Sequence, residues 1–151
     1  MLERVLRSRS EHAGLIDGLS TLYSTLVDMC YLETDDVHFP QAGTESTQID
    51  TAYLETAGFG EDAITLIEQL SGPSGRILHR WASSEAGIPL APGSQAVSYV
   101  SDTVPDLQDM RYIRNSEVEI GENDFKISRC GGTTGEDRIY RFAESKCEKE
   151  T

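Results

Sequence analysis

A long apolar stripe in the first third of the chain most limits what this sequence can fold into. Between residues 15 and 30, apolar side chains recur at steps of three and four residues, which is the repeat of one face of an α-helix. The stripe consists of Leu15, Ile16, Leu19, Leu22, Tyr23, Leu26, Val27 and Cys30. Ser8 and Glu11 have the spacing of a capping box, so we expect this helix to begin near Ser8 or Ser10. A helix with such a face must lie on a hydrophobic core.

Two shorter helices are predicted after a polar loop at residues 33–46. The first has Thr47 as its N-cap and ends at Gly58, because glycine readily adopts the left-handed conformation that closes a helix. The second begins after Gly60, and Glu61 and Asp62 then lie where the helix dipole is positive. Its buried face consists of Ile64, Ile67 and Leu70.

Strand patterns follow in the second half of the chain. Residues 95–100 alternate in polarity, and two β-prone runs flank the glycine-rich segment CGGTTGED, which predicts an antiparallel hairpin. Helices come first and strands later, so we predict an α+β fold, with N-terminal helices packed on a small, mainly antiparallel sheet that ends in a β-hairpin. The length of 151 residues fits a single domain, with flexible ends at about residues 1–8 and 144–151.

Charge and cysteine content limit the partners and the location. The formal net charge is −13, so nucleic acid and anionic membranes are not expected as ligands. The basic cluster of Arg4, Arg7 and Arg9 is interpreted as a solvated helix start. No apolar run approaches the roughly 20 residues that span a membrane. Three cysteines without a CxxC pair, and an N-terminus without the apolar core of a signal peptide, favour the cytoplasm.

Two segments could bind a ligand, and for each a structural interpretation is favoured. CGGTTGED could cradle a phosphate if a helix followed it, but a strand is expected there, so a plain hairpin turn is favoured. Glu33, Asp35, Asp36 and His38 could ligate a divalent ion. No second histidine lies at the four-residue step that would place two ligands together, so a solvated loop is favoured. We expect neither a metal nor a cofactor.

The LHRW segment is the best candidate for an active site. His79 could act as an acid–base residue, with Arg80 stabilising an anion and with Trp81 or Tyr99 lining an apolar pocket. The alternative is that Trp81 belongs to the core and that His79 is an ordinary surface residue. A catalytic His79 would need a carboxylate to orient it, and Glu68 and Glu85 are the candidates.

Two stretches resemble a group of uncharacterised fungal intracellular proteins: LYSTLVDMCYLETDDVHFP and TAYLETAGFGEDAITLIEQL. The layout is also similar, more distantly, to the SUKH superfamily of α+β binding domains. That resemblance implies a protein-interaction role, with no catalytic residues to carry over. Such proteins usually continue past the hairpin, so in this chain the last strand is expected to leave an exposed sheet edge.

Two functions follow as hypotheses. The first is a non-catalytic binding or regulatory domain that recognises a protein or a small ligand, since no complete catalytic constellation is present. The second is a small cofactor-independent enzyme, an isomerase, cyclase or lyase acting on a hydrophobic metabolite, with His79 and Arg80 as its catalytic residues. The uncovered edge also predicts a homodimer, with residues 139–142 near the contact.

Overall fold

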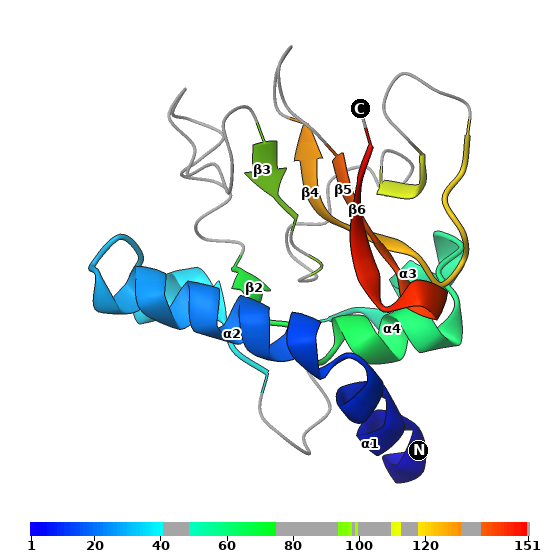
Figure 1. Cartoon of the computed structure of the whole chain (residues 1–151), viewed down its shortest axis with the longest axis horizontal. Helices are drawn as coiled ribbons and strands as arrows, with labels where there is room; N and C mark the ends of the chain where they lie inside the picture. Colours follow the sequence, from blue (N-terminus) through cyan, green and yellow to red (C-terminus); the bar gives the residue numbers. More distant parts are fainter. Residues whose placement is uncertain are drawn as a thin grey trace.

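The helices come from the first half of the chain and the larger sheet from its second half (Figure 1). The computed structural model describes residues 1–40, 49–74, 94–97, 99, 110–112, 118–130 and 137–150. The four named α-helices within these ranges are α1 (Leu2–Glu11), α2 (Ala13–Asp28), α3 (Thr51–Thr56) and α4 (Glu61–Ile67).

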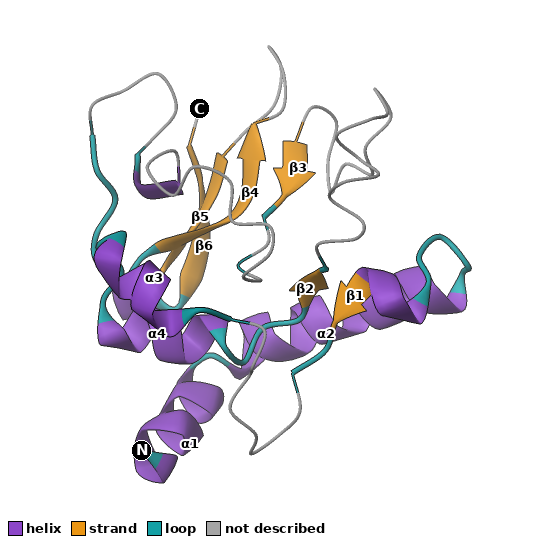
Figure 2. Ribbon diagram, turned by 180° about the vertical axis from the view of Figure 1, so that it is seen from behind, coloured by secondary structure: helices purple, strands orange, loops and turns teal. Residues whose placement is uncertain are grey.

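Two antiparallel sheets accompany the helices. The smaller pairs β1 (Val37–His38), which follows a 3₁₀ turn at Thr34–Asp36, with β2 (Gly72–Pro73). The larger has the order β3–β4–β5–β6, formed by β3 (Ser94–Ala96), β4 (Phe125–Cys130), β5 (Asp137–Arg141) and β6 (Lys146–Glu150). The helices gather at one end of this sheet, as the view from behind also shows (Figure 2). The predicted α+β class and the hairpin of β4 and β5 are confirmed.

A row of aromatic rings runs through the core between the sheet and the helices. Tyr99 meets Phe59 and Phe125 edge-on, with ring centroids 5.8 and 6.3 Å apart, and Phe125 lies 5.5 Å from Tyr140. Helices α2 to α4 and the residues next to them supply the aliphatic part of the same core, in which the buried residues are Ile16, Ile49, Leu54, Ala63, Ile64, Leu66, Ile67 and Leu70. The predicted face of α4 and the first part of the α2 stripe, at Ile16, therefore pack in one core with Phe125 of β4 and Tyr140 of β5. The later part of the α2 stripe, from Tyr23 onward, packs in a second cluster with Leu32 and Val37.

The predicted start of the first helix is wrong. The chain is already helical from Leu2, and Ser8 lies inside α1 with its side chain buried. The helix breaks at His12, whose ψ angle of 22° lies outside the helical range, and α2 begins at Ala13. Ser8 does not cap a helix, because it lies inside α1 and its hydroxyl accepts no backbone amide among the described residues.

The caps of the two shorter helices differ in one detail from the prediction. Asp50 caps α3 by accepting the amide of Tyr53 at 3.0 Å, while the predicted cap, Thr47, lies outside the described residues. Gly58 has a φ of +96°, as predicted for the residue that ends α3. Gly60 precedes α4, and the side chain of Asn123 lies so close to it that a Cβ atom would collide.

The polar C-terminal segment forms a strand, although the sequence predicted a flexible end. Strand β6 pairs with β5 along its whole length, and Arg141 binds Glu148 across the pair at 3.1 Å. Strand β5 is therefore an interior strand, and Ile139 is fully buried. The edge that the homodimer prediction required is filled within the chain, so that argument for a contact through residues 139–142 is wrong.

Helix α2 ends in a Schellman motif with a cysteine at the left-handed position. The amides of Cys30 and Tyr31 donate to the carbonyls of Val27 and Leu26, and Cys30 has a φ of +58°. Glycine usually occupies this position, because a Cβ atom in the left-handed conformation approaches the following carbonyl oxygen. The motif therefore holds Cys30 in a strained conformation.

We expect Cys30→Gly to raise the free energy of unfolding by roughly 0.5–1 kcal/mol by removing this strain. Urea denaturation measures the change. Gly58→Ala is the reciprocal control: a Cβ atom there would find its nearest neighbour at 3.7 Å, so only conformational strain would be added, and stability should fall. Equal stability of Cys30→Gly and the parent chain would contradict the assignment.

The second face of the larger sheet buries an ion pair. Lys126 on β4 donates to Asp137 on β5 at 2.8 Å, and the two side chains are 4% and 3% exposed. The register of β4 against β5 shifts between Lys126 and Ser128, next to this pair. A slip of one residue would move every side chain to the other face, so the pair opposes such a slip.

Removing one partner of this pair should be far more harmful than removing both. Lys126→Met removes the buried cation at 2.8 Å from the Asp137 carboxylate, at an expected cost of about 3–5 kcal/mol. The double variant Lys126→Met/Asp137→Leu should recover most of that loss, because no charge then remains to be desolvated. A double-mutant cycle by thermal or urea unfolding tests this, and additive losses would refute it.

Candidate functional site

A buried histidine holds α1 in place against the sheet. His12 ends α1, precedes α2, and is only 2% exposed. Its Nδ1 atom lies 2.8 Å from the hydroxyl of Tyr140 on β5, and its ring packs on Phe142 at a centroid distance of 4.4 Å. The bend between the two helices is thereby tied to an interior strand of the sheet.

Two polar atoms beside this bend have no hydrogen-bond partner among the residues that the structure describes: the Nε2 atom of His12 and the hydroxyl of Ser8. Burial lowers the pKa of His12, and the charges of Glu11 and Asp62 oppose that shift. The imidazole is therefore neutral near pH 7. Burial likewise raises the pKa of Tyr140, which keeps the hydroxyl protonated for its bond with Nδ1.

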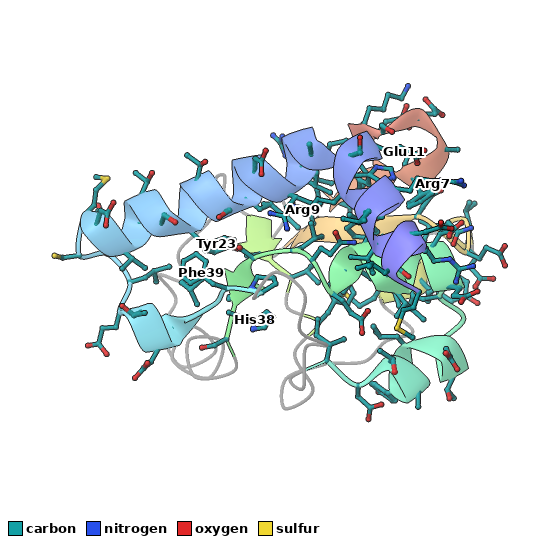
Figure 3. All side chains as sticks on the ribbon, turned by 90° about the horizontal axis from the view of Figure 1, so that it is seen from below. Arg7, Arg9, Glu11, Tyr23, His38 and Phe39 are labelled. Carbon is teal, nitrogen blue, oxygen red and sulfur yellow. The ribbon has the colours of Figure 1, made fainter. Side chains whose placement is uncertain are left out.

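Away from this bend, α1 carries exposed leucines together with exposed charged residues of both signs, among them Glu3. Leu2 and Leu6 lie one turn apart and are 69% and 57% exposed. Arg7 and Arg9 extend to opposite sides of the helix (Figure 3). We call these four residues the α1 outer face. Arg4 belongs to the side that meets α4, because it forms an ion pair with Glu61. Of the three arginines in the predicted cluster, Arg4 therefore contacts α4, whereas Arg7 and Arg9 extend from the surface of α1.

A second exposed apolar surface lies at the far end of α2, remote from α1 (Figure 1). Met29 and Tyr31 are 61% and 62% exposed, and Leu22 is partly exposed on the preceding helix. Asp28 directly precedes Met29 and is exposed, and Asp35, four residues after Tyr31, is also an exposed residue. We call these five residues the α2 tip. It combines apolar with acidic residues, whereas the α1 outer face combines leucines with arginines.

Tyr99, which was predicted to line a pocket, is a buried residue of the hydrophobic core. Its hydroxyl donates to the backbone carbonyl of Lys126 at 2.8 Å, and burial raises its pKa. The ring also lines a cavity of about 40 Å³ between α2, β2 and β4. This volume holds a few water molecules, whereas ligand pockets typically reach about 300–1,000 Å³. The other predicted site residues, His79, Arg80 and Trp81, lie outside the described residues.

A larger hollow of about 270 Å³ borders Arg111, and its described lining is completed by Thr56, Ala57, Tyr112 and Glu119. The guanidinium donates to the carbonyls of Ile120 and Gly121 at 2.9 and 3.2 Å, and it lies 4.8 Å from the ring centre of Phe59. Arg111 is therefore engaged in holding the backbone near residue 120.

The acidic segment after α2 is more ordered than the solvated loop that the sequence favoured. Asp36 is fully buried, and its carboxylate accepts the amide of Glu33 at 2.8 Å. Residues 37 and 38 form β1. Among the residues that the structure describes, no group of three His, Cys, Asp or Glu side chains is arranged to hold a metal ion.

Comparison with models of protein families, with curated proteins and with solved structures finds no match for this chain. The resemblance to the SUKH superfamily therefore stays a prediction. Within the described part of the chain, no helix has the length and apolar character needed to cross a membrane.

Sequence reasoning chose His79 and overlooked His12. The spacing of His12 to Ile16, Leu19 and Tyr23 continues the three- and four-residue steps of the stripe on α2. A histidine in line with such a stripe faces the core, so its burial was predictable. The exposed side of α1 could not be found in the same way, because the predicted helix began only at Ser8.

The burial of His12 predicts a specific loss of stability in acid. The neutral ring contributes its full stability above its ordinary pKa of 6.5, and the contribution falls as the pH drops toward the lower folded value, because the unfolded chain takes up the proton first. We expect His12→Gln to flatten the fall in unfolding free energy between about pH 7.5 and pH 5. His38→Gln, at a partly exposed histidine, is the control. The same slope in the parent chain and His12→Gln would contradict the prediction.

Proposed function

We propose that this chain is a non-catalytic binding domain that recognises another protein through the α1 outer face. The observation that carries the proposal is the exposure of Leu2 and Leu6 on a helix whose other side is fastened to the body. Exposed leucines flanked by arginines are suited to a protein contact, because the apolar groups supply burial and the guanidinium groups supply directed hydrogen bonds. Buried His12 and the Arg4–Glu61 ion pair support this by orienting α1 before any partner arrives.

Other features agree with a binding role in the cytoplasm. The cavity beside Tyr99, one of the residues expected to line a substrate pocket, has room for a few water molecules only. Cys30 and Cys147 are exposed free thiols, as is usual for proteins of reducing compartments. The resemblance to SUKH domains implies the same kind of function.

A photo-crosslinking residue placed beside the α1 outer face, at position Ser10, tests the proposal in a lysate of the cells that make the chain. We expect the chain with both leucines unchanged to form a covalent adduct of defined mass. The variant Leu2→Glu/Leu6→Glu should lose most of that adduct. Both leucines are exposed, so this variant should retain its fold, which circular dichroism verifies.

Tyr53→Glu is the matched control, because Tyr53 is an exposed apolar residue on α3, outside the α1 outer face. The control should keep the adduct. If the adduct forms equally well with the leucine variant, or if no adduct forms at low salt, α1 is not the recognition surface.

A further inference from the structure

We propose that the junction at His12 is an acid-sensitive fastening, which releases α1 from the body when the imidazole is protonated and so withdraws the α1 outer face from its partner. The second half of this inference rests on the proposed function, because it names the regulation of the same surface. The release itself depends only on contacts within the chain.

Helix α1 is attached to the body by few contacts. It projects beside α4 at the edge of the molecule (Figure 1), and Ser8 is the one residue of this fully described helix that is buried. The hydrophobic core and the partly buried residues packed against it include no residue of α1. The Arg4–Glu61 ion pair is exposed to solvent and therefore contributes little. Helix α1 can thus separate from the body while the core between the other helices and the sheet stays packed.

The hydrogen bonding of His12 suits a neutral ring better than a charged one. Its Nδ1 atom lies 2.8 Å from the Tyr140 hydroxyl, and its Nε2 atom has no partner among the described residues. Both nitrogens of an imidazolium are donors, so protonation adds a donor to either neutral tautomer. A new donor at Nε2 meets no acceptor in the described surroundings, and a new donor at Nδ1 prevents the Tyr140 hydroxyl from donating there. The charged ring is better solvated in water, which it reaches when α1 is released.

The charges around the ring compensate this cost only in part. Glu11 on α1 and Asp62 on α4 both favour the imidazolium. From β5 the ring meets Tyr140, whose raised pKa keeps it uncharged. The carboxylate within the 3₁₀ turn Phe142–Glu144 forms an ion pair with Lys146, and the first turn of α2 has no titratable side chain.

The balance of these effects sets the direction of the response to pH. Burial outweighs the two carboxylates and lowers the pKa of His12 while α1 is docked, whereas the released ring regains its ordinary pKa of 6.5. Docking is therefore most favourable above pH 6.5 and weakens as the pH falls toward the lower docked value. A released helix of ten residues is marginal in water, so Leu2 and Leu6 are then no longer held on one helical face. Acid should thus weaken binding of the partner.

Hydrogen exchange read by mass spectrometry at about pH 7.5 and about pH 5.5, corrected for the intrinsic effect of pH on exchange, tests the release. The protection of the α1 amides should fall about three- to tenfold in acid. The upper limit arises because the lower pH lies about one pH unit below the ordinary pKa of histidine, which allows the released state to gain at most about tenfold. The amides of α4 should keep their protection.

Three variants separate His12 from other titrating groups. His12→Gln should lose the dependence on pH, because glutamine takes up no proton in this range, and His38→Gln should retain it. Tyr140→Phe removes the hydroxyl at Nδ1, so its α1 amides should be less protected already at the higher pH. Equal α1 protection at the two pH values in the parent chain overturns the inference, and so does α1 protection in Tyr140→Phe equal to that of the parent.

The parent chain alone decides if His12→Gln does not fold. The α1 amide signals in NMR spectra should then shift with the same pH midpoint as the ring protons of His12. A different midpoint overturns the inference.

The crosslinking experiment at the same two pH values distinguishes this inference from the proposed function. The adduct that depends on Leu2 and Leu6 should decrease in acid by about the factor seen in exchange, and it should persist in His12→Gln. An adduct of equal yield at both pH values overturns the inference and leaves the proposed function intact. If α1 is released in acid but no leucine-dependent adduct forms at either pH, the proposed function fails and the release stands.

Discussion

The burial of β5 on both faces is the constraint on which the rest of the structure depends. Ile139 and Tyr140 are neighbours in the chain and point to opposite sides of the sheet, yet they are 0% and 3% exposed. Tyr140 joins the aromatic row and reaches His12, so the bend between α1 and α2 is located by this strand. The other side carries the buried pair of Lys126 and Asp137. One five-residue strand thus determines both the register of the sheet and the position of the N-terminal helices.

The two faces of β5 achieve their burial at different energetic cost. The face toward the helices is aromatic and aliphatic, so its burial is favourable without any special geometry. The face with Lys126 and Asp137 buries charges, and such a pair contributes little net stability unless its geometry is good. The ion pair instead makes one register of β4 against β5 specific, because any other register would separate the two charges within an interior that excludes water. Packing supplies stability here, while the ion pair selects the arrangement.

The parts of the fold that could be predicted are those in which a local residue pattern has a single physical explanation that does not depend on distant residues. The helix α2 and the glycine at Gly58 have such an explanation and are confirmed, although Leu22 and Cys30 of the predicted stripe are exposed. Strand β6 could not be predicted, because KCEKE has no apolar alternation and pairs only by virtue of its neighbour β5. Helix α1 was missed since its leucines face outward, so the helix lacks a buried stripe. Both failures concern segments whose structure depends on tertiary contacts.

The same dependence explains why a binding surface can lie on α1. A helix of ten residues is marginal by itself in water, so α1 persists through a few contacts: the Arg4–Glu61 ion pair, the buried Ser8 and the junction at His12. Elements with few buried apolar contacts open at lower free energy than the core does. If a partner binds as proposed, its binding energy stabilises α1, so occupancy of the α1 outer face would raise the stability of the helix that carries it. Protonation of His12 acts in the opposite direction on the same helix, because it disfavours the junction that orients the face. The proposed binding at the exposed side and the titration of His12 at the buried side would therefore be coupled through α1.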